Sequence, residues 1–259
     1  MIPAGFQNVE GQLLIWMVAM LRPGAAFLAA PMFGANAVPV QLRLVLALAV
    51  GIPSAAMVNM TLPAAGIISL PGFFMIVSEV MAGLAMGFVI QIAFAAALVA
   101  GEAISNTMGL GFASMVDPAN GISVPVIGQV FMILVTLLFL AMNGHLVVFE
   151  VLTESFFTLP VGGGFLVDNY WEIANKLSWV LGAALLLVLP AITALLVVNL
   201  AFGVMTRAAP QLNIFSIGFP LTLVLGLVIV WIGMADILAQ YQVFATEALQ
   251  FLREMARAS

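Results

Sequence analysis

Long stretches without a single ionisable side chain constrain this sequence more than any other feature. They include Leu44–Ser78, Val80–Gly101, Leu177–Thr206 and Ala208–Ala235. A helix of about 20 residues is enough to cross the hydrocarbon core of a bilayer, which is about 30 Å thick. Each of these stretches is therefore long enough to span a membrane as a helix.

The composition excludes a soluble domain. Of the 259 residues, 64% are hydrophobic and 7% are charged, whereas soluble domains carry about 25% charged residues. Closed β-barrels also span membranes, but their strands are about ten residues long and alternate apolar with polar residues. The apolar runs here do not alternate in this way, so the sequence predicts an all-α, polytopic integral membrane protein.

Several classes of site are not expected from the composition. The chain has no cysteine, which excludes disulfides, thiolate metal sites and cysteine nucleophiles. The formal net charge of −5 argues against a nucleic-acid partner. No glycine-rich nucleotide loop of the Walker A type occurs. Residues Met1–Gln12 contain no basic residue, so no removable signal peptide is expected.

Six helical segments are predicted, separated by proline and glycine. They are Leu13–Phe33, Val40–Leu62, Phe73–Ala100, Val126–Met142, Leu177–Phe202 and Leu212–Ala235, with a shorter apolar run at Leu146–Leu159. Pro53 and Pro190 lie inside segments and predict bends, which need neighbouring protein at membrane depth. Lys176 and Arg207 flank opposite ends of one segment, so the positive-inside rule gives no orientation. We expect bent, Pro- and Gly-interrupted hairpins that are supported by partner subunits.

Small residues recur four positions apart on the third segment, at Gly83 and Gly87 and then at Ala93, Ala97 and Gly101. Small side chains let helix backbones approach closely in membranes. The sequence leaves open whether these residues pack within this chain or against another subunit.

The chain becomes more polar after Ala235 and predicts an amphipathic C-terminal tail. One face of this tail is apolar and consists of Ile237, Tyr241, Ala245, Ala248 and Leu252, and its end carries Arg253, Glu254 and Arg257. We expect this helix to lie at an interface or against a partner.

The candidates for an ionisable residue within the membrane are Arg22, Glu79, Glu102, Asp117 and Glu150. A charge in hydrocarbon costs about 2.5 to 3.5 kcal/mol, so each is a candidate functional residue. Glu79 and Glu102 bracket one segment, which fits a proton-coupled transporter or ion channel. The same position also fits an interfacial or interhelical role, in which neither carboxylate carries protons.

A serine and histidine pair is a further candidate for chemistry, at Ser123 and His145. The local sequence is a poor match to a hydrolase, because neither GxSxG nor HExxH occurs. His145 follows Asn143 and Gly144, so a capping or hydrogen-bonded role at a helix end is the preferred interpretation. No catalytic role and no cofactor are expected.

The stretch Gly109–Gly128 is the most unusual part of the sequence. Its glycines and prolines predict a loop rather than a continuous helix, and Asp117 before Pro118 is typical of a turn. Its apolar residues include Leu110, Phe112, Met115 and Val116. Irregular backbone at membrane depth is tolerated where protein or a cavity surrounds it, and apolar constrictions can gate a pore by excluding water. A buried or pore-lining loop is favoured over a re-entrant surface loop.

Four patches of sequence together form a recognisable pattern. The first patch is Arg22, Ala30-Pro31, Val38-Pro39 and Arg43. The second is Gly101-Glu102, Met108-Gly109-Leu110, Phe112-Ala113-Ser114 and Val116-Asp117-Pro118. The third is Phe139, Asn143-Gly144-His145 and Leu159-Pro160. The fourth is Arg207 to Phe215, which includes Gln211, with Gly218 to Leu221. In this order the patches resemble the FliR family, the export-gate subunit of flagellar and related type III secretion systems, and the resemblance covers nearly the whole chain. Pro23 departs from the family's pattern, in which an ordinary helix former follows Arg22.

The resemblance implies a division of the chain and a pore plug. Residues 1–175 would form a portion similar to FliP, and residues 176–259 a helical hairpin similar to FliQ that ends in the amphipathic tail. The loop 108–127 would close the pore as a plug. In that role Leu110, Phe112, Met115 and Val116 would obstruct the pore, and Gly109, Gly111, Gly121 and Gly128 would act as hinges.

The resemblance also implies partners and a location. The expected partners are FliP-like and FliQ-like membrane subunits in a hetero-oligomeric gate, an FlhB-like subunit, unfolded export substrates and membrane lipid. The expected location is the bacterial inner membrane at the flagellar basal body, as a multi-pass protein.

Overall fold

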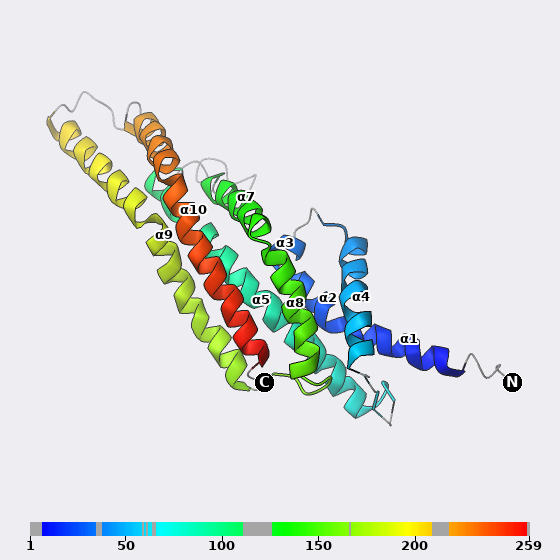
Figure 1. Cartoon of the computed structure of the whole chain (residues 1–259). Coiled ribbons are helices and arrows are strands. Elements are labelled where there is room, and N and C mark those ends of the chain that lie inside the picture. The colour runs from blue at the N-terminus through cyan, green and yellow to red at the C-terminus, as the bar shows by residue number, and fades with distance from the viewer. Residues whose placement is uncertain are drawn as a thin grey trace. The chain divides into compact units, whose positions relative to one another are not determined.

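The computed structural model describes residues 7–34, 38–58, 60, 62–63, 66–110, 126–165, 167–208 and 218–257. The helices are α1 Gln7–Ala19, α2 Leu21–Ala29, α3 Pro31–Gly34, α4 Val40–Met57, α5 Leu70–Thr107, α7 Val126–Ala141, α8 Gly144–Thr158, α9 Val167–Ala208 and α10 Phe219–Arg257 (Figure 1). The part of the chain that is described contains no strand. Five helices are long and apolar enough to cross a membrane, or six if α7 and α8 count as one broken span. The prediction of an all-α, polytopic membrane protein is confirmed.

The first predicted segment, Leu13–Phe33, is broken into three helices rather than one. The break between α1 and α2 comes just before Arg22 and Pro23. Proline fits here because it lies in the first turn of α2, where a backbone N–H has no partner within the helix. The departure at Pro23 therefore has a local structural reason.

Three helices are much longer than the apolar segments that predicted them. α5, α9 and α10 contain 38, 42 and 39 residues, which corresponds to about 57 to 63 Å at 1.5 Å per residue. The hydrocarbon core is about 30 Å thick. Unless strongly tilted, each of these helices extends well beyond the hydrocarbon.

The chain divides into two compact units. Unit 1 consists of Met1–Ile92, Asn143–Leu177 and Thr246–Ser259, and unit 2 of Ala93–Met142 and Ser178–Ala245. α5, α9 and α10 contribute to both units. The predicted division between residues 175 and 176 rests on a likeness to FliP and FliQ. The two compact units do not test that likeness, so the division stays a prediction.

In unit 1, the small-residue face of α5 packs against α2 of the same chain. A Cβ on Gly83 would lie 2.1 Å from the carbonyl oxygen of Arg22, and a Cβ on Gly87 would lie 2.4 Å from that of Ala26. Real Cβ atoms do not approach backbone this closely. These glycines therefore serve packing within the chain, which was one of the two alternatives left open by the sequence.

The C-terminal part of α10 also belongs to unit 1 and is tied to α8 and α9 by ion pairs. Their N–O distances are 2.8 Å for Arg253–Glu150, 3.0 Å for Arg257–Glu154 and 3.6 Å for Lys176–Glu247. The predicted apolar face of this tail is buried at Ile237, Tyr241, Ala245 and Leu252. These residues are thus buried within this chain, and the expectation that the tail lies at an interface or against a partner stays a prediction.

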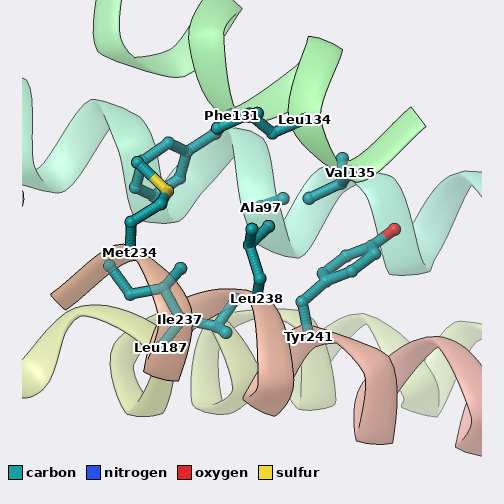
Figure 2. A pocket seen from close by; sticks show the side chains of 9 residues that line it. All are labelled: Ala97, Phe131, Leu134, Val135, Leu187, Met234, Ile237, Leu238 and Tyr241. Atoms are coloured by element: carbon teal, nitrogen blue, oxygen red, sulfur yellow. The ribbon is translucent and has the colours of Figure 1, made fainter. Parts of the chain in front are cut away.

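In unit 2, α5, α7, α9 and α10 meet around a small apolar cavity. Its volume is about 10 Å³, and its lining includes Phe131, Val135, Ile237 and Tyr241 (Figure 2). The Tyr241 ring stacks edge-on against Phe94, with 6.4 Å between ring centroids. A cavity of this size holds one water at most and needs polar partners to do so. Because the lining is apolar, we interpret it as a packing gap rather than a binding site.

Candidate functional site

A buried ion pair joins Arg22 of α2 to Glu79 of α5. Arg22 Nε donates to Glu79 Oε2 at 2.9 Å, and Arg22 Nη2 donates to Glu79 Oε1 at 2.9 Å. The two side chains are 0% and 1% exposed. This is the two-pronged geometry in which the planar guanidinium matches a carboxylate.

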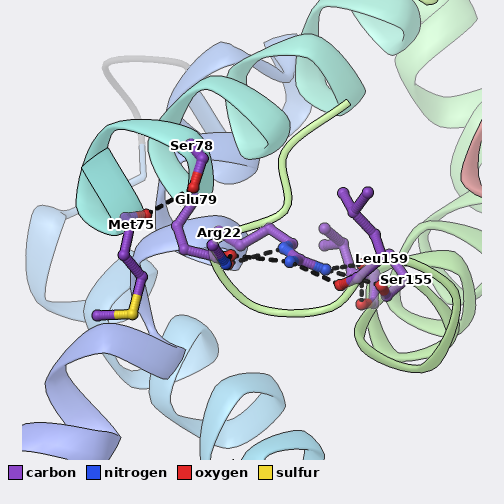
Figure 3. Close-up of polar contacts among 8 residues, drawn as sticks. Arg22, Met75, Ser78, Glu79, Ser155 and Leu159 are labelled. Carbon is purple, nitrogen blue, oxygen red and sulfur yellow. Dashed lines mark hydrogen bonds and ion pairs between the residues drawn. The ribbon is translucent and has the colours of Figure 1, made fainter. Parts of the chain in front are cut away.

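The remaining donors of Arg22 are directed at the end of α8. Nη1 donates to the backbone oxygen of Ser155 at 2.7 Å and to its Oγ at 3.1 Å, and Nη2 donates to the backbone oxygen of Leu159 at 3.1 Å. Figure 3 shows the guanidinium lying between the Glu79 carboxylate and these atoms. Arg22 thus makes five hydrogen bonds, as many as a guanidinium has N–H donors.

Two more contacts complete the site. Glu79 Oε1 accepts a hydrogen bond from the backbone N–H of Gly162 at 3.0 Å, and the Phe156 ring lies 4.4 Å from Arg22 Cζ. The pair therefore links α2, α5, the end of α8 and the turn that follows α8. Removing one partner of a buried ion pair leaves an uncompensated charge and costs about 3 to 5 kcal/mol.

This arrangement bears on the proposed use of Glu79 and Glu102 in proton transport. Glu79 is held by Arg22 and Gly162 and is almost inaccessible to solvent. Glu102 is partly exposed, belongs to the other unit and lies 23 residues further along α5, which is about six helical turns. Neither unit brings the two carboxylates together.

Most of the predicted plug lies outside the described residues. This applies to Phe112, Met115, Val116, Gly111, Gly121 and Asp117, and also to the family-motif residue Gln211. Their proposed roles stay predictions.

The structure does describe the end of α5, where the predicted plug begins. Gly109 has φ +84, its N–H donates to the carbonyl of Asn106 at 3.0 Å, and the N–H of Leu110 donates to the carbonyl of Ser105 at 3.0 Å. These two bonds, together with the left-handed conformation of the glycine that follows the helix, form a Schellman motif. Gly109 therefore ends the helix, and the left-handed conformation explains why a glycine stands here.

Two predictions overlap at the far end of the loop, because the helical segment Val126–Met142 and the loop Gly109–Gly128 share residues 126–128. α7 begins at Val126, so the helical prediction is confirmed there, and Ile127 and Gly128 do not belong to the loop. Gly128 packs against Gly101: a Cβ on Gly101 would lie 2.6 Å from the Gly128 Cα. The hinge role of Gly128 stays a prediction, and its observed contact is one between helices α5 and α7.

Four other predicted polar residues occupy helix ends or connections. Arg43 Nη2 donates to the carbonyls of Val38 at 2.9 Å and Gly34 at 3.3 Å, so it closes the connection between α3 and α4. Arg207 is exposed in the last turn of α9, where a cation is favourable to the helix dipole.

Asn143 and His145 lie at the break between α7 and α8. Asn143 has φ +58 and precedes α8, but its side chain makes no capping hydrogen bond. His145 lies in the first turn of α8, and its Nδ1 is buried without a partner among the described residues. The predicted position at a helix end is observed, whereas the predicted hydrogen bond is not observed at Nδ1. Among the described residues, no three His, Cys, Asp or Glu side chains gather as a metal site would require.

Sequence reasoning missed most of the groups around Arg22. Ser155, Leu159 and Gly162 contribute mainly backbone atoms, and every residue type has those, so no sequence pattern could have predicted these contacts. Leu159 belongs to one of the family patches, but no role was predicted for it. It also missed two residues that contact the end of α5, Asn199 on α9 and Gly226 on α10. An amide within an otherwise apolar helix was the available signal for Asn199.

Comparison with known proteins gives a consistent result. A family model described as "Bacterial export proteins, family 1" matches residues 13–248. The "Flagellar biosynthetic protein FliR" of Escherichia coli (strain K12) is 40% identical over 228 residues, which cover 85% of this chain and 86% of that protein. The protein of the same name from Pectobacterium carotovorum subsp. carotovorum is 40% identical over 162 residues, 62% of each chain. The "Surface presentation of antigens protein SpaR" of Shigella sonnei is 28% identical over 167 residues, 64% of each chain.

Proposed function

This chain belongs to the bacterial export proteins, family 1, and we propose that it is a subunit of the flagellar type III protein export gate. The observation that carries the proposal is the 40% identity to a flagellar biosynthetic protein over 85% of the chain. The identity to SpaR is lower, at 28% over 64% of the chain, which favours a flagellar role. The protein would be a multi-pass component of the bacterial inner membrane at the flagellar basal body.

Within the gate, the chain would form part of the wall of the export pore. The lengths of α5, α9 and α10 support this role, because each exceeds the thickness of the hydrocarbon core. α9 and α10 also expose large apolar side chains, for example Leu185, Leu196, Leu200, Trp231 and Ile232. Such a surface is suited to contact with lipid or with partner protein. FliP-like and FliQ-like subunits would be that partner protein, and an FlhB-like subunit would join the gate.

The segment 108–127 would act as the plug that closes the pore to small ions. Support comes from its apolar residues and from the defined end of α5 at Gly109, from which the segment departs. Unfolded export substrates would pass when the plug withdraws. The chain itself would catalyse nothing and would bind no cofactor, so the energy for export would come from other components.

Native mass spectrometry tests the assembly. The chain is expressed alone and together with its FliP-like and FliQ-like partners, and each sample is solubilised in detergent. We expect one copy of this chain in a large mixed complex. A stable assembly of this chain alone would instead favour the transporter or channel alternative, for which Glu102→Gln would abolish proton coupling.

Conductance measurements test the plug. The assembled complex is reconstituted with residues 111–125 replaced by a short Gly-Ser linker, and small-ion leakage is compared with that of the unmodified complex. We expect leakage to rise. Unchanged leakage would count against the plug.

A further inference from the structure

Two residues from other helices of unit 2 hold the end of α5. Nδ2 of Asn199 on α9 donates to the carbonyl oxygen of Thr107, the last residue of α5, at 3.2 Å. The next residue, Met108, is 1% exposed and lies against Gly226 of α10. We infer that Asn199 and Gly226 are positioning residues, which fix the point where the chain leaves α5. We call Thr107, Met108, Asn199 and Gly226 the α5 clasp.

The hydrogen bond from Asn199 completes the pairing of the last helical turn. The carbonyls of Ile104, Ser105 and Asn106 accept from the N–H groups of Met108, Leu110 and Gly109. The carbonyl of Thr107 is the fourth that a helix end leaves open, and Asn199 supplies its partner. An unpaired carbonyl is costly where water is scarce. Asn199 therefore stabilises this particular end of α5 from a second helix.

The sequence of α9 supports a specific role for Asn199. It is the one Asn or Gln in the uncharged stretch Leu177–Thr206. An amide in an apolar helix is unfavourable unless it hydrogen-bonds across to another helix. The half-buried Asn199 does so, whereas Thr193 on the same helix is exposed and donates only to the carbonyl of Leu189 in its own helix.

Gly226 leaves the space that Met108 occupies. A Cβ at position 226 would lie 2.6 Å from Met108 Cγ, 2.9 Å from its Sδ and 2.8 Å from its Cε. Because the clash involves the side chain from Cγ onward, movement of the terminal methyl group alone would not relieve it. Gly233 on the same helix has no atom nearer than 3.9 Å. The requirement for glycine is therefore local to position 226.

Because of the α5 clasp, the point where the chain leaves α5 depends on the positions of α9 and α10. A hydrogen bond weakens steeply once its partners move apart or lose alignment, so a small shift of α9 along its axis would release Thr107. This consequence rests on the proposed function, because the segment that starts at Met108 is the proposed plug. The structural inference concerns only residues up to Leu110, and it can be tested separately.

Thiol labelling at Leu110 tests the clasp in the full chain, purified with its partner subunits. The sequence contains no cysteine, so Leu110→Cys introduces a single reactive site, and a maleimide measures how often it becomes accessible. We expect Asn199→Leu and Asn199→Asp to raise the labelling rate about fivefold, because each loses the donor to Thr107. Thr193→Val, which removes a polar group from α9 without touching the clasp, should leave the rate unchanged.

Glycine substitutions give an independent measurement in the same background. Gly226→Ala should raise the labelling rate, because Met108 has to move, whereas Gly233→Ala should not. Unchanged rates in Asn199→Asp and Gly226→Ala would overturn the inference. It would also be overturned if Thr193→Val raised the rate as much as Asn199→Asp, or if Gly233→Ala raised it as much as Gly226→Ala. Asn199→Asp keeps the size of the side chain, and its thermal unfolding midpoint shows whether the comparison is made on folded protein.

The outcome is separable from that of the plug experiment. Leakage after replacement of residues 111–125 reports on the proposed function, whereas labelling at position 110 reports on the clasp. Raised labelling with unchanged leakage would support the α5 clasp and contradict the plug assignment. Raised leakage with unchanged labelling would support the plug and overturn the clasp.

Discussion

Gly101 of α5 and Gly128 of α7 face each other so closely that a Cβ on Gly101 would lie 2.6 Å from the Gly128 Cα and 2.9 Å from its nitrogen. Both clashing atoms are backbone, so no side-chain rotation relieves the clash. We expect Gly101→Ala to destabilise the protein by about 1 to 3 kcal/mol, the usual cost of overpacking.

Thermal unfolding of the purified protein in detergent measures this effect. Gly182→Ala on α9 is the matched control, because a Cβ on Gly182 would meet no atom within 4 Å and alanine is the better helix former. The control should leave the midpoint unchanged or raise it. Equal midpoints for the two variants would contradict the close crossing of α5 and α7.

Loss of Arg22 should be among the most damaging single changes in unit 1. Arg22→Met would leave the Glu79 carboxylate buried and unpaired, and the expected cost is about 3 to 5 kcal/mol. Arg22→Lys should recover little, because one ammonium group cannot reproduce a guanidinium's paired contact with Glu79. The yield and thermal midpoint of folded protein measure both variants. Arg207→Met, at an exposed position on α9, is the control and should be near neutral.

A double variant separates the charge from the packing around it. Arg22→Met combined with Glu79→Leu removes both charges, so the penalty for an unpaired carboxylate disappears. We expect the double variant to be more stable than Arg22→Met alone, although the N–H of Gly162 loses its acceptor. Additive losses would mean that Arg22 and Glu79 act independently, contrary to their geometry.

The fold class was predictable from the sequence, but helix lengths were not. Uncharged stretches located α4, α5, α9 and α10, because burying a charge in hydrocarbon is costly, whereas the candidate span Gly11–Ala29 contains Arg22. The same criterion ended the predicted segments too early: α5 continues past Glu102, α9 begins before Lys176 and α10 runs on past Asp236. A charged residue limits an apolar segment but does not by itself end a helix, because Glu, Lys and Arg are good helix formers.

The candidate site was predictable only in part. Arg22 and Glu79 stood out as charges in apolar surroundings, yet the sequence could not show that they pair, since 57 residues separate them. The glycines gave a clearer signal: the spacing of Gly83 and Gly87 predicted close helix packing, and the structure shows which helix they contact. Partners such as the Leu159 carbonyl are backbone atoms and leave no trace in residue type.

The pairs Glu150–Arg253 and Glu154–Arg257 repeat at the same spacing of four residues on α8 and on α10. Arg253 and Glu150 are 40% and 59% exposed, so each such pair contributes about 0.2 to 1 kcal/mol. We expect Arg253→Glu to lower the thermal midpoint slightly at low salt, because it faces Glu150 and lies next to Glu254. The added change Glu150→Arg should restore the midpoint. High salt should reduce the difference, and a salt-independent loss would contradict an electrostatic cause.

Substitutions at Gly109 distinguish between two roles for this residue, a fixed helix cap and a freely rotating hinge. Its φ of +84 places it in the left-handed region, where a residue with a Cβ costs about 1 to 2 kcal/mol, and asparagine tolerates this region better than alanine. A cap therefore predicts that Gly109→Asn is more stable than Gly109→Ala, with Gly203→Ala, at an open position on α9, near neutral. A hinge that must sample many conformations predicts instead that both substitutions at position 109 impair function equally. Thermal midpoints ranked as glycine, asparagine and alanine would support the cap, because only a fixed left-handed residue produces that order.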